Sequence, residues 1–271
     1  ASGCASDCAI ARGAIAATAA VRICVTRAAS RGDRELDLRS PTPIECDAAM
    51  SDKPASLWLV TMAKKLEGVD VSGEIDIDQY LTVIEAIPPI YDGLFAGVPI
   101  VPGQLKNDIA FGIKMMTSKK EELGEGSPKK LTLEGMVTKE KAAKGDKWKK
   151  MGGDNKTGTR GILWLNRATT FITMLMEKVA GGMEPSAAGA EAYATILKPY
   201  HGWMISKVVG SAMSSAPKKE VILDRLGHPD KPLTDEEAKA QLAAFVTPMK
   251  ALVTKISDFL EKEGCNFPDK A

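Results

Sequence analysis

The chain has 271 residues, of which 36 are basic and 35 are acidic, so its formal net charge is +1. This balance speaks against a nucleic-acid-binding protein and against a strongly charged partner. No apolar stretch approaches the roughly 18 to 20 residues that a membrane-spanning helix needs, so we expect a soluble protein. The length favours a single substantial domain with a loose terminus.

The first 49 residues differ in composition from the rest of the chain. They are rich in Ala, Ser and Arg, and residues 1–32 hold four arginines against one aspartate. This bias is typical of an organelle targeting segment, whereas MSDKPAS, beginning at Met50, reads like a translation start that would make residues 1–49 upstream sequence. Under either interpretation we expect 1–49 to be a disordered, targeting or upstream segment and 50–271 to be the folded domain.

Cysteine use is uneven along the chain. Four of the five cysteines lie in the first 50 residues, and the predicted domain holds only Cys265. A domain with one thiol has no internal disulfide, which fits a reducing, cytoplasmic compartment. Cys4 and Cys8 lack a CxxC pair or nearby histidines, so we expect no metal and no cofactor.

From Leu57 onward, aliphatic residues recur every three or four positions, which predicts amphipathic helices throughout. Clusters of Pro and Gly, such as IPPIYDG, GEGSP and GHPDKP, mark the expected breaks. Thr234 and Glu237 have the spacing of a capping box at the start of a helix. The pattern indicates an all-α domain. The predicted helices cover residues 57–67, 77–87, 104–122, 131–144, 158–180, 187–198, 200–215, 218–226, 235–243 and 246–262.

Motifs of catalysis are missing or incomplete. The stretch GGDNKTGTRG (152–161) has glycines with phosphate-loop spacing, but Thr159 stands where the loop needs lysine and no strand precedes it. The sequence holds neither a GxSxG nor an HExxH motif, and its two histidines have no acid/base pair beside them. We therefore expect a protein that is not an enzyme.

The helix predicted over 158–180 carries an unusual stripe. Helical spacing places Arg160, Trp164, Arg167 and Phe171 along one side, beside an aliphatic stripe that includes Ile162. One interpretation is a tryptophan at the core edge with snorkelling arginines. The other is a recognition platform, in which the indole packs on a sugar ring and the guanidiniums hold hydroxyls or an acidic oxygen.

Two further polar residues stand in apolar helical surroundings. On a helix beginning at Pro199, His201 would share a face with Ile205 and Val208, where a core aliphatic residue is expected; a satisfied core histidine is the alternative. Asp108 lies beside Ile109 on another predicted helix. Together with Trp164, these residues suggest a polar pocket that caps an apolar cavity.

At these residues the sequence resembles the glycolipid transfer protein family. The resemblance is carried by VPIVPGQLKNDIAFGIKMM, which contains Asp108, by ILWLNRATTFI, which contains Trp164, and by AYATILKPYHGWMISKVVGSAMSSAP, which contains His201. The segment TLEGMVTKEKAAKGDKWKK resembles the family's connecting segment. The resemblance therefore extends from about Trp58 to the end of the chain.

The resemblance implies a two-layer α-helical sandwich of about eight helices that binds one sphingolipid. Asp108 would bond headgroup hydroxyls and the ceramide amide N–H, Trp164 would stack on the first sugar, and His201 would donate to the ceramide carbonyl. Trp203 would dip into the bilayer interface near the cavity entrance. The implied protein is a monomer that touches membranes transiently.

The sequence also departs from the family pattern. Gly112 and Met115 occupy the places of the family's asparagine and lysine, and Lys114 is one position away. Arg160 stands where glycolipid-selective members have an aliphatic residue and where phosphate-reading relatives have arginine. We expect non-enzymatic transfer or sensing of a glycosphingolipid at a cytoplasmic membrane surface. The alternatives are a carrier of ceramide-1-phosphate or another acidic sphingolipid, and a helical protein-interaction adaptor with a vestigial lipid site.

Overall fold

The computed structural model describes a helical unit within Ser51–Ala271. The predicted segment 1–49 and the first four residues of the GGDNKTGTRG stretch (152–155) lie outside the described residues. None of the helices in the described part is long and apolar enough to cross a bilayer. The described residues are 58–95, 100–124, 130–145, 147, 156–226 and 233–269.

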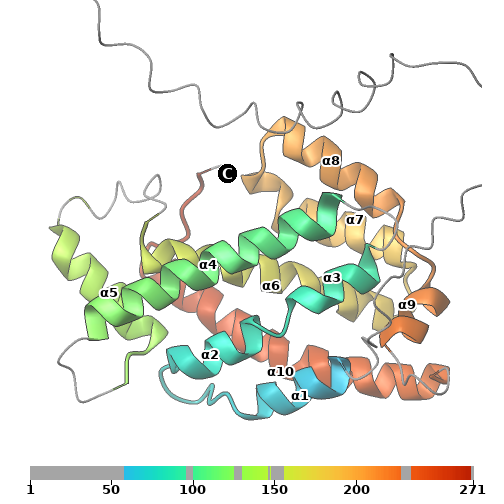
Figure 1. Cartoon of the computed structure of the whole chain (residues 1–271), viewed down its shortest axis with the longest axis horizontal. Coiled ribbons are helices and arrows are strands. Elements are labelled where there is room, and N and C mark those ends of the chain that lie inside the picture. Colours follow the sequence, from blue (N-terminus) through green and yellow to red (C-terminus); the bar gives the residue numbers. More distant parts are fainter. Residues whose placement is uncertain are drawn as a thin grey trace, which may run out of the picture. The chain divides into compact units, whose positions relative to one another are not determined.

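The predicted all-α fold is confirmed (Figure 1). Apart from an isolated bridge between Asp76 and Thr132, the regular structure of the described residues is helical. The helices are α1 (Trp58–Glu67), α2 (Ile77–Ile84), α3 (Pro88–Leu94), α4 (Ile100–Gly124), α5 (Leu133–Lys144), α6 (Gly158–Ala180), α7 (Pro185–Ile196), the 3-10 helix η3 (Lys198–Tyr200), α8 (Trp203–Ser214), α9 (Lys219–Leu226) and α10 (Asp235–Lys262).

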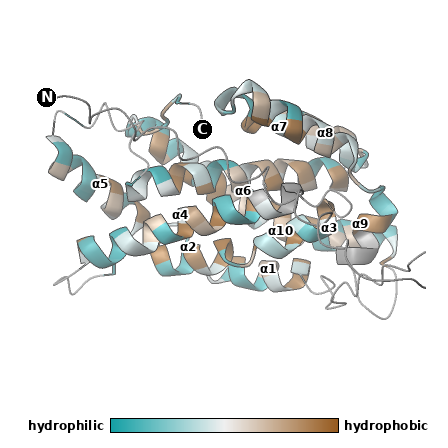
Figure 2. Ribbon diagram, turned by 45° about the horizontal axis from the view of Figure 1, so that its top comes forward, coloured by the Kyte–Doolittle hydropathy of each residue, from teal (hydrophilic) through white to brown (hydrophobic). Residues whose placement is uncertain are grey.

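Helix α6 occupies the centre of the sandwich. Helices α4, α7 and α10 all pack directly on it, α1 packs on α10, and α8 packs on α7 (Figure 1). Figure 2 shows apolar and polar residues alternating around the helices, as expected for amphipathic elements. The predicted aliphatic stripe of α6 is buried, and its members are Ile162, Leu165, Ile172 and Met176.

Three predicted helix breaks are wrong, and one of them covers residues 100–103, which belong to α4. The IPPIYDG stretch contains α3, whose two prolines stand at the first helical positions, where a missing N–H breaks no hydrogen bond. The predicted pair 235–243 and 246–262 is one helix, α10, that continues through Pro248. Phe245 and Met249 are buried on either side of that proline, so packing offsets the lost backbone hydrogen bond. The predicted capping box of Thr234 and Glu237 is confirmed at the start of α10.

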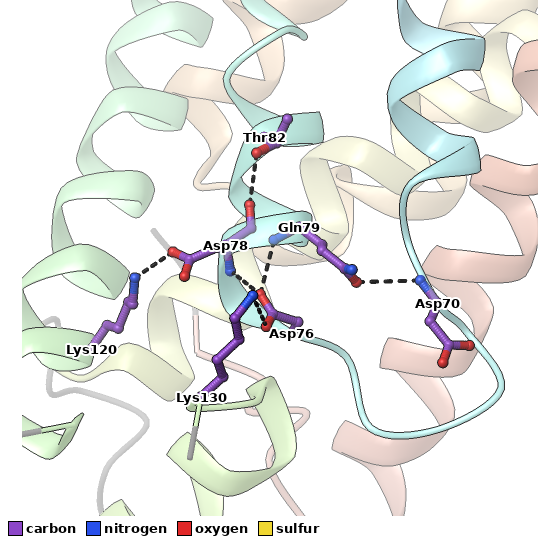
Figure 3. A network of polar contacts seen from close by, with 7 residues as sticks. All are labelled: Asp70, Asp76, Asp78, Gln79, Thr82, Lys120 and Lys130. Atoms are coloured by element: carbon purple, nitrogen blue, oxygen red, sulfur yellow. Dashed lines mark hydrogen bonds and ion pairs between the residues drawn. The ribbon is translucent and has the colours of Figure 1, made fainter. Parts of the chain in front are cut away.

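A polar network holds α2 against its neighbours (Figure 3). The carboxylate of Asp76 accepts hydrogen bonds from two backbone N–H groups in the first turn of α2, at 2.8 and 3.1 Å. Lys130 lies 3.5 Å from the same carboxylate, and Lys120 of α4 pairs with Asp78. These contacts cap α2 and attach it to α4, the helix that carries Asp108, one of the predicted headgroup residues.

The start of α6 is held by a carboxylate from α5. Glu140 is 5% exposed and accepts hydrogen bonds from the backbone N–H of Gly158 and of Thr159, both at 2.8 Å. The Thr159 hydroxyl donates to the same carboxylate at 2.6 Å. Glu140 thereby satisfies the free N–H groups of the helix and complements its dipole. This contact fixes the start of α6, the helix that carries the predicted arginines and tryptophan.

Glu140→Ala should lower the free energy of unfolding by about 2–3 kcal/mol, because it leaves buried helix N–H groups without an acceptor. Urea unfolding followed by circular dichroism measures the change. Glu121→Ala, at an exposed position of α4, is the matched control. Equal destabilisation by the two variants would contradict the capping role of Glu140.

Candidate functional site

The polar stripe of α6 forms a cluster around Trp164. The guanidinium carbon of Arg160 lies 5.9 Å from the centroid of the Trp164 ring, and that of Arg167 lies 5.1 Å from it. Both arginines are 6% exposed, so they do not reach solvent as snorkelling side chains would. The fourth member of the stripe, Phe171, is buried in the core. Trp164 is half-buried and so keeps part of its ring accessible.

The prediction that His201 lies on a helix is wrong, although the structure brings it to Trp164. His201 is extended between η3 and α8, because Pro199 and Gly202 interrupt the helical hydrogen bonding on either side. The predicted core face of this segment is also wrong, since Ile205 and Val208 are 39% and 51% exposed. The rings of His201 and Trp164 stack with centroids 6.2 Å apart and an interplanar angle of 12°.

Tyr193 of α7 orients the imidazole. Its hydroxyl lies 3.0 Å from Nδ1 of His201, while Ser206 Oγ is farther away at 3.4 Å. Burial raises the pKa of Tyr193 and lowers that of His201, so the phenol is protonated and the imidazole neutral near pH 7. When Tyr193 donates to Nδ1, the imidazole proton is on Nε2, which can donate to a ligand carbonyl.

Two neighbours of the arginines were missed in the sequence. The Arg167 guanidinium lies 3.4 Å from the centroid of the Tyr200 ring, a stacked cation–π contact. The residues after α10 (263–269), termed here the post-α10 segment, also reach the site. Arg167 Nη2 donates to Asn266 Oδ1 at 2.8 Å and to the Phe267 carbonyl at 2.7 Å. These partners lie about a hundred residues away along the chain, so no local periodicity could indicate them.

The two guanidiniums are incompletely compensated. Burial, reinforced by the charge of Arg160 and partly opposed by Tyr200 and Asp269, lowers the pKa of Arg167 to about 10, so it stays charged at neutral pH. Asp269 Oδ2 lies 3.5 Å from Arg160 Nη1, which is an ion pair but not a hydrogen bond. Within the described residues, Arg160 Nε and Nη1 and Arg167 Nη1 are buried without a hydrogen-bond acceptor. These N–H groups are donors that oxygen atoms of a ligand could satisfy.

The remaining predicted residues lie on α4, which packs directly on α6. Asp108 is exposed, and its charge adds to the effect of burial in raising the pKa of Tyr91 in α3. A Cβ atom at buried Gly112 would stand 2.7 Å from Leu165 Cγ, so an asparagine there would clash with α6. Lys114 is exposed. Their roles in binding stay predictions.

The predicted apolar cavity also stays a prediction. One surface pocket of the described residues lies between α6 and α10 and is lined by Glu177, Lys250 and Asp258, among others. A second lies near Asp78 and Lys120. Neither pocket is lined by the residues predicted to hold the headgroup.

With this geometry established, comparison with known proteins decides the family. The profile of the family described as Glycolipid transfer protein (GLTP) matches residues 75–228, more than half of the chain. The chain belongs to the glycolipid transfer protein family.

Individual members of this family match most of the chain. Glycolipid transfer protein A of Xenopus laevis is 26% identical over 206 residues, which cover 73% of this chain and 92% of that protein. The glycolipid transfer protein of Aureobasidium melanogenum is 26% identical over 214 residues, covering 76% and 94% of the two chains.

Solved structures show the same fold. A structure described as showing how FAPP2 selects simple glycosphingolipids matches with a TM-score of 0.66 and 20% identity, covering 79% of this chain and 99% of that one. Apo mouse ceramide-1-phosphate transfer protein matches with a TM-score of 0.62 and 18% identity, covering 77% and 98%. The predicted GLTP sandwich is therefore confirmed as the fold.

In this GLTP-family chain, an apolar patch covers part of α8. Trp203, its first residue, is 70% exposed, and Lys207 Nζ lies 5.2 Å from the centroid of its ring. Exposed apolar residues grouped on one helix form a candidate interaction surface. The patch, called here the α8 patch, consists of Trp203, Met204, Ile205 and Val208.

His201 should titrate below its ordinary pKa of 6.5, because burial disfavours the imidazolium. As the pH falls, the unfolded chain takes up this proton first, so stability is fully present above pH 6.5 and is lost as the pH falls below it. NMR titration of the two histidines measures the pKa, and His228→Gln assigns the signals. A midpoint for His201 at or above 6.5 would show that its ring is not buried as described.

Proposed function

We propose that this protein binds a glycosphingolipid and carries it between membranes without catalysing a reaction. The observation that carries the proposal is the half-buried Trp164 ring, stacked on His201 and flanked by Arg160 and Arg167. A partly accessible indole packs on the C–H face of a sugar, and the neighbouring N–H groups bind hydroxyl oxygens.

His201 and Asp108 would hold the ceramide amide. With the proton on Nε2, His201 donates to the ceramide carbonyl and so satisfies an oxygen whose burial otherwise costs about 1–3 kcal/mol. Asp108, on the exposed side of α4, would accept from the amide N–H and from sugar hydroxyls. Gly112 and Lys114, on the same helix, complete the predicted headgroup residues.

Removal of the lipid chains from water supplies the free energy that holds the lipid in the protein. Each methylene of a lipid chain contributes about 0.8 kcal/mol when it leaves water for an apolar interior. We place the two chains between helices of the sandwich and the headgroup at the Trp164 cluster. The polar cluster selects the lipid, because an unmatched headgroup leaves buried polar groups unpaired. Neither ATP nor a metal enters this cycle.

The α8 patch supports transient contact with a bilayer. Trp203 combines an apolar body with an N–H group, a combination that favours the membrane interface. We propose a monomer in the cytoplasm that docks peripherally through this patch, with any organelle targeting supplied by residues 1–49. The family relatives named above are described as glycolipid transfer proteins, which supports a glycolipid as the cargo.

A second candidate cargo is an acidic sphingolipid, favoured by the buried guanidinium of Arg160. Its unpaired N–H groups suit a phosphate or sulfate better than a neutral hydroxyl. A fold neighbour is human ceramide-1-phosphate transfer protein in complex with 12:0 ceramide-1-phosphate. The other alternative is a protein-binding adaptor with a vestigial lipid site. Mass spectrometry of lipids that co-purify with the protein distinguishes the three.

Trp164→Ala should reduce transfer of galactosylceramide between vesicles by about tenfold or more, because the sugar loses its stacking surface. Fluorescence transfer assays measure the rate, and circular dichroism verifies the helical content. Trp164→Phe, which keeps an aromatic face, should retain much of the activity. Unchanged transfer by the alanine variant would refute the stacking role.

Trp203→Ala should weaken association with vesicles by about tenfold, since an exposed aromatic side chain no longer enters the interface. Co-sedimentation measures association, and titration with a short-chain galactosylceramide measures lipid affinity, which should change little. Val71→Ala, another exposed apolar position, serves as the control. A loss of lipid affinity without a loss of vesicle binding would contradict the docking assignment.

A further inference from the structure

We propose that Asp269 determines the charge preference of the headgroup site by serving as an internal counter-anion for Arg160. The inference rests on the proposed function, because it concerns which sphingolipid headgroup the Trp164 cluster accepts. In this arrangement an acidic headgroup competes with the Asp269 carboxylate for the arginines, whereas a neutral sugar does not.

The geometry places one carboxylate against two buried cations. Arg160 and Arg167 are each 6% exposed and both lie beside the Trp164 ring. Asp269 Oδ2 approaches Arg160 Nη1 to 3.5 Å, and its charge also acts on Arg167. The carboxylate therefore cancels part of the positive charge of the cluster. The cluster keeps a net positive charge, which one additional anionic group could neutralise.

The ion pair between Asp269 and Arg160 is electrostatic and leaves N–H groups of Arg160 without a hydrogen bond. Arg160 Nε and Nη1 have no hydrogen-bond acceptor within the described residues, although both are buried. A carboxylate that fully pairs with an arginine usually accepts two parallel N–H···O hydrogen bonds, with N···O distances shorter than the one between Asp269 and Arg160. A sulfate or phosphate group has several acceptor oxygens and could satisfy these N–H groups directly, at the expense of the ion pair to Asp269.

The post-α10 segment is anchored in the core two residues before Asp269. Cys265 and Phe267 are buried in the core, and the Phe267 carbonyl accepts from Arg167. Two residues farther on, the Asp269 side chain is 45% exposed. Figure 1 shows this segment leaving the end of α10 as a coil. The carboxylate can therefore leave Arg160 without withdrawal of the anchoring residues from the core.

Asp269→Asn tests the inference, because it removes the charge and keeps the shape. Vesicle transfer is measured for galactosylceramide and for its sulfated form with the same acyl chain, and the ratio of the rates is compared with that of the unmodified protein. The ratio of sulfated to neutral lipid should rise about threefold or more, the range of a partly exposed ion pair. Asp258→Asn, an exposed aspartate of α10, should leave the ratio unchanged.

A double-mutant cycle with Arg160→Leu identifies the partner of Asp269. In the Arg160→Leu background, Asp269→Asn should change the ratio much less than it does alone. A full-sized effect there, or an unchanged or lower ratio in the single variant, overturns the inference while neutral transfer still supports the proposed function. If the unmodified protein moves neither lipid, the proposed function fails and the inference fails with it.

Discussion

The burial of two guanidinium groups on one side of α6 is the constraint on which the site depends. Moving a charged group out of water costs several kcal/mol unless new partners replace its hydration. Arg167 has such partners in the Tyr200 ring, Asn266 and the Phe267 carbonyl. Arg160 has fewer partners, namely the Trp164 ring and the ion pair with Asp269. The asymmetry suggests that Arg160 is the cation left for a ligand.

Close packing between α4 and α6 positions the cluster relative to Asp108. A Cβ atom at Gly112 would collide with Leu165, and one at Gly161 would come within 3.2 Å of the Gly112 carbonyl. These glycines let the two helices approach closely, so packing accounts for the absence of an asparagine at position 112. The polar atoms that such an asparagine would provide must then come from elsewhere. Arg160, one turn before Trp164, is a source of donors on the opposite helix.

Local periodicity was sufficient to predict most of the fold. The bounds of α1, α5 and α6 lie within a few residues of those expected, because each helix has a clear apolar stripe and a polar side. The failures came from prolines. Proline at the start of α3 is compatible with helix, and Pro248 in α10 is tolerated because its neighbours are buried. A sequence shows where proline stands, but the packing that outweighs its cost is a property of the folded chain.

The site was predicted unevenly for a related reason. The stripe of Arg160, Trp164 and Arg167 follows from helical spacing alone, so it was visible in the sequence. The position of His201 was not, since it depends on two helix-interrupting residues, although its partnership with Trp164 followed from the family resemblance. Asn266 gave no signal, because it lies 99 residues from its partner Arg167 along the chain. Tyr193 is only eight residues from His201, but their contact depends on how the chain turns between α7 and α8.

The combination of Trp164 with Arg160 bears on selectivity itself. An aromatic face stabilises a bound sugar through dispersion and C–H contacts, and this contribution is nearly independent of charge. A buried cation attracts an anion, and this electrostatic attraction is strong because the effective dielectric constant of the surroundings is low. A headgroup with both a sugar ring and an acidic oxygen would stack on Trp164 and pair with Arg160. A headgroup with only one of these features would make only one of these contacts. The Asp269 carboxylate then matters most for lipids with an acidic group, because such a group must displace it from Arg160, whereas a neutral sugar binds the ring of Trp164 while Arg160 stays paired.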